Sequence, residues 1–310
     1  MKCLILGGCG FIGSYVSEVL LEHGYQVRIL DKENVNTGRI AHMLGDVELL
    51  QGNYANRSVI EEALEGIDYV IHLIGTTLPK ASCENPVYDI ETDVVPTVNL
   101  LTTASKISRI RKVIFSSSGG TIYGLPNKVP IPEGHPTFPI CPYGISKLVI
   151  EKYLHYFYVS KGLNYTSLRI SNPYGERQNI HGRQGAISVF MGRIAEGKEI
   201  EIWGDGQTGR DFIYVKDVAE AFVNTMEYEG SCKIFNVGSG NMTSLNQLIH
   251  LIEEISVRKA KIRYLQNRDF DLPENVLDIR KIRDEVKWEP QTPLVEGLGK
   301  MWEFIRSTEK

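Results

Sequence analysis

The chain opens with Lys2-Cys-Leu-Ile-Leu-Gly-Gly-Cys-Gly-Phe-Ile-Gly13, in which a short apolar run leads into glycines with the spacing G-x-x-G-x-x-G. The apolar run predicts a buried strand, and residues 12–22, followed by Gly24, predict a helix. Glycines at a strand-to-helix turn let the first backbone amides of the helix approach a pyrophosphate. We therefore predict a dinucleotide site at Gly7, Gly10, Phe11, Ile12 and Gly13.

The next predicted strand, at residues 26–30, ends beside Asp31. A carboxylate at this position accepts hydrogen bonds from the hydroxyls of an adenosine ribose. The same negative charge repels a 2′-phosphate. The sequence therefore favours NAD over NADP as the cofactor.

Strand and helix signals alternate through the first half of the chain. Further apolar runs predict strands at residues 68–73, 112–116 and 166–170. Helical patterns are predicted at residues 58–64, 94–105 and 143–160. This alternation predicts an α/β fold with a Rossmann-type, doubly wound parallel sheet.

After about residue 171 the pattern changes to connections rich in proline and glycine. We predict an NAD-binding domain over residues 1–171 and a smaller, mainly substrate-binding region over residues 172–310. Two short segments, 212–215 and 234–237, are candidates for returning to the main sheet.

Composition argues against several classes of function. The 310 residues carry 34 basic and 38 acidic side chains, and the resulting net charge of -4 predicts no general attraction to nucleic acid or anionic membranes. No apolar run approaches the roughly 18 residues of a membrane span. The seven histidines lack the paired spacing of metal sites, so no metal is predicted. Five scattered cysteines favour reduced thiols and a cytoplasmic location.

The segment Tyr143-Gly-Ile-Ser-Lys147 places a phenol and an amine on one face of a predicted helix. A phenol, with an ordinary pKa of about 10, becomes a base near neutrality only if fixed positive charge lowers its pKa by about 3. Lys147 supplies one such charge, and an oxidised nicotinamide adds another. This arrangement suits removal of a hydroxyl proton while hydride leaves the same carbon. We predict alcohol oxidation, with Tyr143 and Lys147 as catalytic residues that also contact the cofactor.

Together with Asn172-Pro-Tyr-Gly175, these motifs resemble those of the extended short-chain dehydrogenase/reductases. Over nearly its whole length the chain is similar to the nucleotide-sugar epimerases of that family, of the UDP-galactose/UDP-glucose 4-epimerase type. The similarity continues through Gly209-Arg-Asp-Phe-Ile-Tyr-Val215 and Arg268-Asp-Phe-Asp-Leu-Pro273. It implies a UDP-sugar substrate that is held by Asn172, Arg210, Arg268 and Asp271.

The resemblance has further implications for the cofactor and for assembly. Asn53 and Tyr54 occupy positions that lie near the adenine in relatives, and Asp93 occupies a position near the nicotinamide where many relatives carry Asn. The predicted helices at 94–105 and from Tyr143 onward resemble those that form a dimer contact in relatives. We therefore expect bound NAD and a homodimer.

One position departs from the family pattern. Many relatives carry a Ser or Thr three residues before the Ile-Tyr-Gly end of a strand, where it hydrogen-bonds the reacting hydroxyl. Alignment on Ile122-Tyr123-Gly124 places Gly119 there. Ser118 and Thr121, ranked above Ser117, are the predicted replacements, both as catalytic and as substrate-binding hydroxyls.

The segment Gly120-Thr-Ile122 also lacks the Asp-Glu pair of the related 4,6-dehydratases and the Glu of the UDP-glucuronate decarboxylases. An epimerase needs only one base and a reversible hydride store. We therefore predict NAD-dependent 4-epimerisation of a UDP-sugar through a transient 4-keto intermediate. Where a bulky Tyr in relatives disfavours N-acetyl groups, this chain has Asn275. UDP-glucose, UDP-N-acetylglucosamine and UDP-glucuronate all stay open as substrates.

Two other functional classes also stay open. One is a nucleotide-sugar reductase or dehydrogenase that turns over external nicotinamide. The other is a non-catalytic relative that only binds NAD. The intact Tyr143 and Lys147 pair argues against the second class, whereas Gly119 leaves it open.

Overall fold

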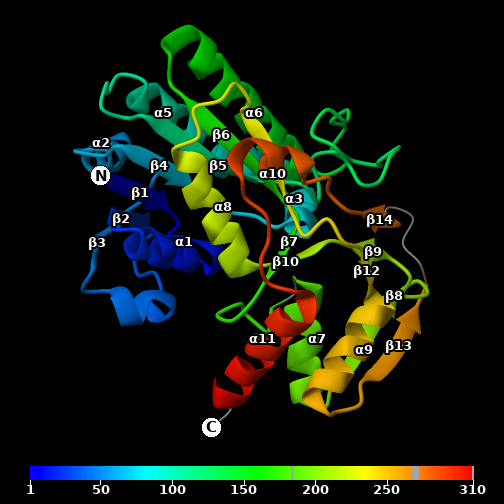
Figure 1. Cartoon of the computed structure of the whole chain (residues 1–310). Coiled ribbons are helices and arrows are strands. Elements are labelled where there is room, and N and C mark those ends of the chain that lie inside the picture. The colour runs from blue at the N-terminus through cyan, green and yellow to red at the C-terminus, as the bar shows by residue number, and fades with distance from the viewer. Residues whose placement is uncertain (183–184, 267–271, 309–310) are drawn as a thin grey trace.

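The computed structural model describes residues 1–182, 185–266 and 272–308, which are drawn in Figure 1. A seven-stranded sheet with the order β11-β6-β5-β4-β1-β2-β3 forms its larger part, and every strand pairs in parallel with its neighbours. The strands are β1 (Lys2–Leu6), β2 (Gln26–Asp31), β3 (Val47–Gln51), β4 (Tyr69–His72), β5 (Lys112–Ser118), β6 (Tyr165–Ile170) and β11 (Ile234–Val237). The predicted Rossmann-type parallel sheet is confirmed.

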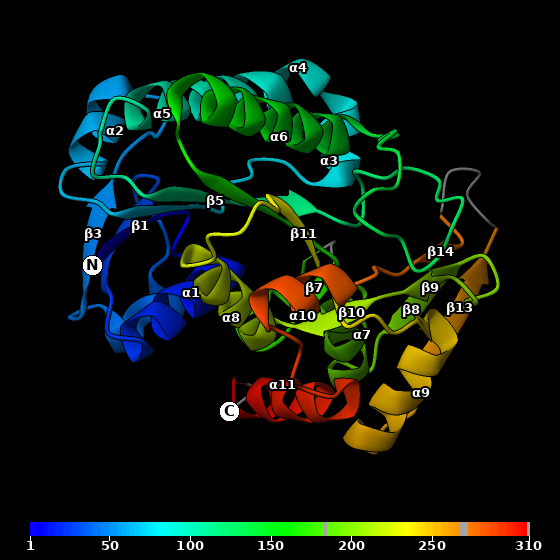
Figure 2. The same ribbon diagram turned by 45° about the horizontal axis from the view of Figure 1, so that its top comes forward.

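Helices cover both faces of this sheet, as Figure 2 shows. Cys3 and Ile5 of β1 pack in one buried cluster with α1 (Phe11–Glu22) and α8 (Val215–Met226). Leu4 and Leu6 point to the opposite face and pack in a second cluster. That face is covered by α2 (Arg57–Ala63), α5 (Val95–Ala104) and α6 (Pro142–Lys161). Because side chains alternate along a strand, a strand covered on both faces is apolar throughout.

Short helical turns connect the elements of the sheet. The 3₁₀ helix η1 (Gly38–Met43) lies between β2 and β3. Between β4 and α5 the chain forms α3 (Pro79–Glu84), α4 (Pro86–Asp89) and the π-helical turn η2 (Ile90–Val94). This turn packs against α6. Single π turns within helices occur frequently at functional sites.

The remaining elements build a smaller region around a third buried cluster. Three small sheets belong to it: β7 (Asn172–Tyr174) with β10 (Phe212–Tyr214), β8 (Glu199–Trp203) with β13 (Lys261–Leu265), and β12 (Thr243–Ser244) with β9 (Gly209–Arg210) and β14 (Glu274–Asn275). Its helices are α7 (Ala186–Ala195), α9 (Leu245–Ser256) and α11 (Leu294–Thr308), and α10 (Arg280–Val286) precedes α11.

The two segments considered as returning strands lie in different places. Residues 234–237 form β11, which pairs with β6 at the edge of the main sheet. Residues 212–214 form β10, which pairs with β7 in a separate two-stranded sheet. Since β7 directly follows β6, β10 lies beyond the end of the main sheet and not within it.

A buried ion pair fastens α6 to the sheet. Glu151 of α6 and Arg169 of β6 have side chains that are 2% and 4% exposed, with the carboxylate oxygen Oε2 2.7 Å from Nη2. Arg169 Nε also donates to Oε1 at 3.0 Å, and the hydroxyls of Ser117 and Ser167 donate to the same oxygen at 2.7 and 3.0 Å. The pair therefore links α6 to both β5 and β6.

Removal of the cation from this pair should destabilise the protein strongly. Arg169→Met leaves the Glu151 carboxylate buried without a counter-charge, and we expect the free energy of unfolding to fall by about 3–5 kcal/mol in urea titrations. Arg57→Met is the matched control, because Arg57 pairs with Glu61 at the surface, where its side chain is 74% exposed. That loss should stay below about 0.5 kcal/mol. Equal losses in the two variants would contradict this account.

Candidate active site

The glycine-rich turn brings the end of β1 close to the start of α1. A Cβ atom at Gly13 would lie 2.2 Å from the carbonyl oxygen of Gly7, so no side chain fits there. Gly7 itself has a φ of +87°, a conformation that favours glycine. Helix α1 begins after Gly10, and no side chain within the described ranges caps it. An uncapped helix start of this kind favours an anionic ligand.

The turn opens into a cavity of 980 Å³ at the carboxyl ends of β1, β2 and β4. Gly7, Gly10, Asp31, Asn53 and Tyr54 of the predicted cofactor site line it. One oxygen of the Asp31 carboxylate accepts the backbone N–H of Cys9 at 3.0 Å, which fixes the glycine turn against β2. The structure thus gathers residues from the first three strands of the chain around one space.

Other residues of the predicted cofactor site lie beside this cavity. Phe11 and Ile12 begin α1, and their side chains pack against the first buried cluster. The side-chain oxygen of Asn53 accepts the N–H of Ala55 at 2.9 Å, and the Tyr54 hydroxyl donates to the carbonyl of Thr92 at 2.7 Å. These contacts fix both side chains in the wall of the cavity.

Tyr143 and Lys147 lie one turn apart near the start of α6. The hydroxyl of Ser82, a buried residue of α3, accepts the backbone N–H of Tyr143 at 3.0 Å and so fixes this end of the helix. The Lys147 side chain is buried, and its Nζ lies 4.9 Å from the centre of the Phe115 ring and 5.5 Å from that of Tyr143. A Cβ at Gly75, which lines the cavity, would lie 3.7 Å from Nζ.

The Lys147 ammonium makes no hydrogen bond or ion pair with any residue in the described ranges. Burial lowers the pKa of Lys147, and the carboxylates of Asp93 and Asp89 raise it. A buried ammonium costs several kcal/mol unless acceptors or anions surround it, so this group is suited to receive a ligand.

The pKa of Tyr143 differs in direction from the sequence-based expectation. Burial raises this pKa above its ordinary value, and electrostatic interactions with Asp93, Cys141 and Asp89 raise it further. The expected lowering by Lys147 is not seen. Its ammonium lies near the faces of two aromatic rings, and burial disfavours a phenolate. Further positive charge is therefore needed before Tyr143 can act as a base.

The hydroxyls near the end of β5 have distinct surroundings. Ser117 donates to Glu151 and is thus committed to the buried ion pair. The Thr121 hydroxyl oxygen is buried and has no partner among the described residues. Ser118 is half-buried at the end of β5, and no hydrogen bond of its side chain is seen in the described part of the chain.

Gly119 is closely covered by the carboxyl-terminal part of the chain. A Cβ at this position would lie 2.5 Å from Cδ1 of Leu277 and 3.1 Å from the carbonyl oxygen of Arg169. The side-chain amide of Asn275 donates to the Gly119 carbonyl at 3.3 Å. Asn275 is buried and lies opposite Arg210 in the pairing of β14 with β9. Leu277 therefore occupies the space that a side chain at position 119 would need.

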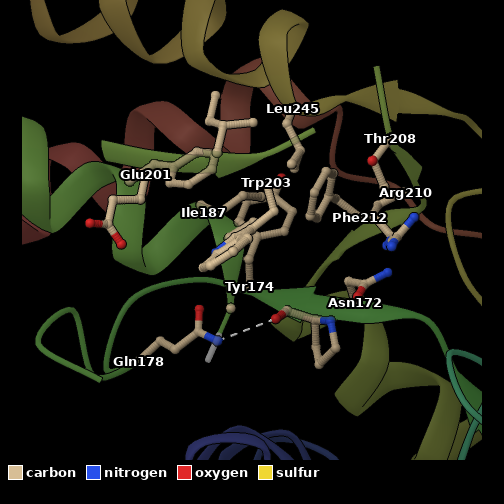
Figure 3. A pocket seen from close by; sticks show the side chains of 15 residues that line it. Asn172, Tyr174, Gln178, Ile187, Glu201, Trp203, Thr208, Arg210, Phe212 and Leu245 are labelled. Carbon is tan, nitrogen blue, oxygen red and sulfur yellow. Dashed lines mark hydrogen bonds between the residues drawn. The ribbon is translucent and has the colours of Figure 1, made fainter. Parts of the chain in front are cut away.

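A second cavity, of 470 Å³, lies in the smaller region and is shown in Figure 3. Asn172 and Arg210, which the resemblance implies as substrate-binding residues, line it. The Asn172 amide donates to the carbonyl of Asp211 at 2.9 Å, and Nη1 of Arg210 donates to the carbonyls of Gly209 and Leu272 at 2.8 Å each. Arg268 and Asp271, which the resemblance also placed here, lie outside the described residues.

Sequence reasoning missed several residues of the second cavity. Trp203, Phe190 and Gln178 belong to its lining. In Figure 3 the Phe212 ring lies between Trp203 and Arg210, and Gln178 lies on the other side of Trp203. A lone Trp at the end of an alternating apolar strand carries no local signal of function, so only the folded arrangement identifies it. An aromatic ring beside a guanidinium suits a ligand with a flat base and a phosphate.

Comparisons with known proteins agree with this geometry. Residues 3–238 match the model of the NAD dependent epimerase/dehydratase family. A putative UDP-glucose 4-epimerase from Methanocaldococcus jannaschii is 37% identical over 99% of both chains. A dTDP-4-dehydro-6-deoxyglucose reductase from Escherichia coli is 34% identical over 98% of this chain and 97% of its own. The crystal structure of UDP-glucose 4-epimerase from Thermotoga maritima with UDP-glucose superposes with a TM-score of 0.94 at 37% identity, covering 100% of both chains.

The crowding at Gly119 predicts a measurable coupling with Leu277. Gly119→Ser should lower the free energy of unfolding by about 1–3 kcal/mol, because its Cβ overlaps Leu277. In the double variant with Leu277→Ala the combined loss should be smaller than the sum of the two single losses by more than about 0.5 kcal/mol. Urea titration of the four proteins measures this difference. Strictly additive losses would show that Leu277 does not restrict the position.

Proposed function

Because the chain belongs to the NAD dependent epimerase/dehydratase family, we propose that it catalyses NAD-dependent 4-epimerisation of a UDP-sugar through a transient 4-keto sugar. One observation carries the proposal. The buried Lys147 ammonium, which has no hydrogen bond or ion pair among the described residues, lies one helical turn from Tyr143 and beside a glycine-lined cavity. A dinucleotide in that cavity supplies both the acceptors and the positive charge that this pair lacks.

The residues of the first cavity fit NAD. The space at Gly13 and Gly7 admits backbone only, so a pyrophosphate can approach the uncapped start of α1. Asp31 lines the cavity at the end of β2. Its carboxylate oxygens can accept further hydrogen bonds, which suits the hydroxyls of a ribose. When bound, NAD accepts a hydride from C4 of the sugar and later returns it.

Tyr143 moves the proton in this proposal. Its oxygen takes the proton of the sugar 4-hydroxyl as the C4–H bond breaks, and a carbonyl forms at C4. After the keto-sugar has turned its other face, the same oxygen returns the proton, so no net oxidation results. Lys147 stabilises the phenolate while it exists, and Ser118 and Thr121 are the proposed orienting hydroxyls. Ser117 is unsuitable for that role because it is bonded to Glu151.

The second cavity is the proposed site of the UDP moiety. The Arg210 guanidinium suits a diphosphate, and Asn172 lies beside it on β7. Trp203 provides an aromatic face for the uracil ring, since base-aromatic stacking contributes about 1–3 kcal/mol per base. Arg268 and Asp271 stay part of the proposal on the strength of the sequence pattern alone.

Asn275 bears on which sugar is accepted. Its side chain is held against the Gly119 carbonyl and is shorter than a tyrosine. A hexose and an N-acetylhexosamine both fit this reading, and UDP-glucose, UDP-N-acetylglucosamine and UDP-glucuronate are the candidates to test.

A second function is favoured by one comparison, since the Escherichia coli relative is named as a nucleotide-sugar reductase. A reductase consumes external reduced nicotinamide in proportion to product, whereas an epimerase leaves nicotinamide absorbance unchanged during conversion. NMR of the products from a panel of UDP-sugars, with absorbance recorded in parallel, separates the two functions.

We also propose that the enzyme is a cytoplasmic homodimer. An apolar stripe runs along α6 through Ile145, Tyr156 and Val159, whose side chains are 48%, 55% and 71% exposed. Val95 of the neighbouring α5 is 49% exposed. Exposed apolar side chains at this helical spacing suit a helix-helix contact between two copies. All five cysteines are free thiols, as a reducing compartment would keep them.

Tyr143→Phe should separate binding from catalysis. The substitution removes the proton acceptor and keeps the ring, so we expect kcat to fall about 100-fold to 10,000-fold while the Kd for UDP-sugar stays within about threefold. Tyr153→Phe is the matched control on the exposed side of the same helix and should keep full activity. Full activity in Tyr143→Phe would remove Tyr143 from the mechanism.

The dimer proposal predicts that acidic substitutions in the α6 stripe convert the dimer into a monomer. The variant with Tyr156→Glu and Val159→Glu should sediment as a monomer, because burial of two carboxylates in an apolar contact is unfavourable. Val295→Glu, at an equally exposed position on α11, should leave the dimer intact. A monomeric wild-type protein at micromolar concentration would refute the proposal.

A further inference from the structure

Two buried carboxylates interact electrostatically with the Lys147 ammonium, and both raise its pKa. Asp93, on the π-helical turn η2, is 3% exposed, and its two oxygens accept the backbone N–H of Thr76 at 3.0 and 3.3 Å. Asp89, at the end of α4, is fully buried and accepts the hydroxyl of Thr77. Thr76 lines the proposed cofactor cavity. Both carboxylates therefore fix the segment after β4 that contains Thr76 and Thr77.

The charges of this cluster do not balance within the described structure. When both carboxyl groups are ionised, Asp93 and Asp89 bring two negative charges against the one positive charge of Lys147. His72, the nearest further base, stays neutral, because burial and then the charge of Lys147 lower its pKa to about 3. Its Nε2 is bonded to the hydroxyl of Thr97 at 2.8 Å.

The other groups that face Asp93 add no positive charge. Tyr54 donates its hydroxyl to the carbonyls of Thr92 and Asp93, and burial raises its pKa, so it is a neutral phenol. Tyr143 is neutral for the same reason. One oxygen of Asp89 is buried without a partner in the described residues. With Asp93 and Asp89 ionised, the wall of the cavity next to Lys147 thus has a net negative charge.

We propose that Asp93 is a positioning residue that gives this wall its negative charge. That charge favours the oxidised, cationic nicotinamide over the reduced one. It also keeps Tyr143 a phenol until the cation is bound. The inference rests on the proposed function, because it requires NAD in the first cavity. It explains why a carboxylate is useful at a position where an asparagine would make the same hydrogen bond to Thr76.

The electrostatic directions agree with this role. The Asp93 charge raises the pKa of both Lys147 and Tyr143. It therefore keeps the ammonium charged and opposes an early loss of the phenolic proton. Burial raises the pKa of Asp93 itself, whereas Lys147 and the N–H of Thr76 lower it. The role requires Asp93 to be ionised, and the experiment below tests this condition directly.

Asp93→Asn removes the charge and keeps an oxygen that can accept the N–H of Thr76. In full-length protein loaded with NAD, without sugar, the midpoint potential of the bound nicotinamide is measured against redox dyes at neutral pH. We expect the ratio of reduced to oxidised cofactor at a fixed potential to rise about tenfold, which is a shift of about 30 mV for two electrons. The pH midpoint of Tyr143 ionisation, from ultraviolet difference spectra against the Tyr143→Phe variant, should fall by about one unit.

Asp46→Asn, an exposed aspartate after η1, is the matched control and should change neither value. Asp89→Asn should shift the potential in the same direction as Asp93→Asn and provides a second variant if the first fails to fold. An unchanged potential in a folded, NAD-loaded Asp93→Asn protein overturns this inference and leaves the epimerase proposal intact. Failure of the wild-type protein to bind NAD overturns both.

Discussion

A single ammonium group, Lys147, is held inside the protein without a hydrogen bond from the described residues, and the surrounding elements fix its place. The ion pair between Glu151 and Arg169 fastens its helix to the sheet one turn further along. Ser82 fixes the start of the same helix through the backbone of Tyr143. The rings of Phe115 and Tyr143 lie beside the amine, and a Cβ at Gly75, which lines the cavity, would lie 3.7 Å from it. Catalysis, in this view, depends on a charge that the protein keeps incompletely satisfied.

The two cavities are joined by contacts between the end of the main sheet and the smaller region. Gly119, just after β5, is covered by Leu277 and bonded to Asn275, and Asn275 pairs with the strand that carries Arg210. In the proposed function, a UDP-sugar with its UDP moiety in the second cavity would extend its sugar from the diphosphate toward this junction. The departure from the family pattern at Gly119 is therefore a packing change and not only a missing hydroxyl.

The parts of this arrangement that local spacing determines were predictable from the sequence. The parallel sheet follows from apolar runs and helical periodicity, and the glycine turn, Asp31, Tyr143 and Lys147 follow from short motifs. Strand β3 was missed, because its residues are only partly buried and alternate weakly. Ser82 and Leu277 were missed because each acts on a residue far away in the chain: the bond from Tyr143 to Ser82 spans 61 residues. No local pattern records such contacts, and the raised pKa of Tyr143 likewise follows from burial in the folded chain.

The return of the chain to the main sheet has a consequence for biosynthesis. Helix α8, which covers one face of the sheet together with α1, begins only at Val215, and the edge strand β11 follows at Ile234. A ribosome that makes the chain from its amino terminus therefore completes six strands of the main sheet while α1 alone of these two helices is present to cover that face. Truncation before α8 would leave both an open edge beside β6 and a partly uncovered apolar face, and both features favour aggregation.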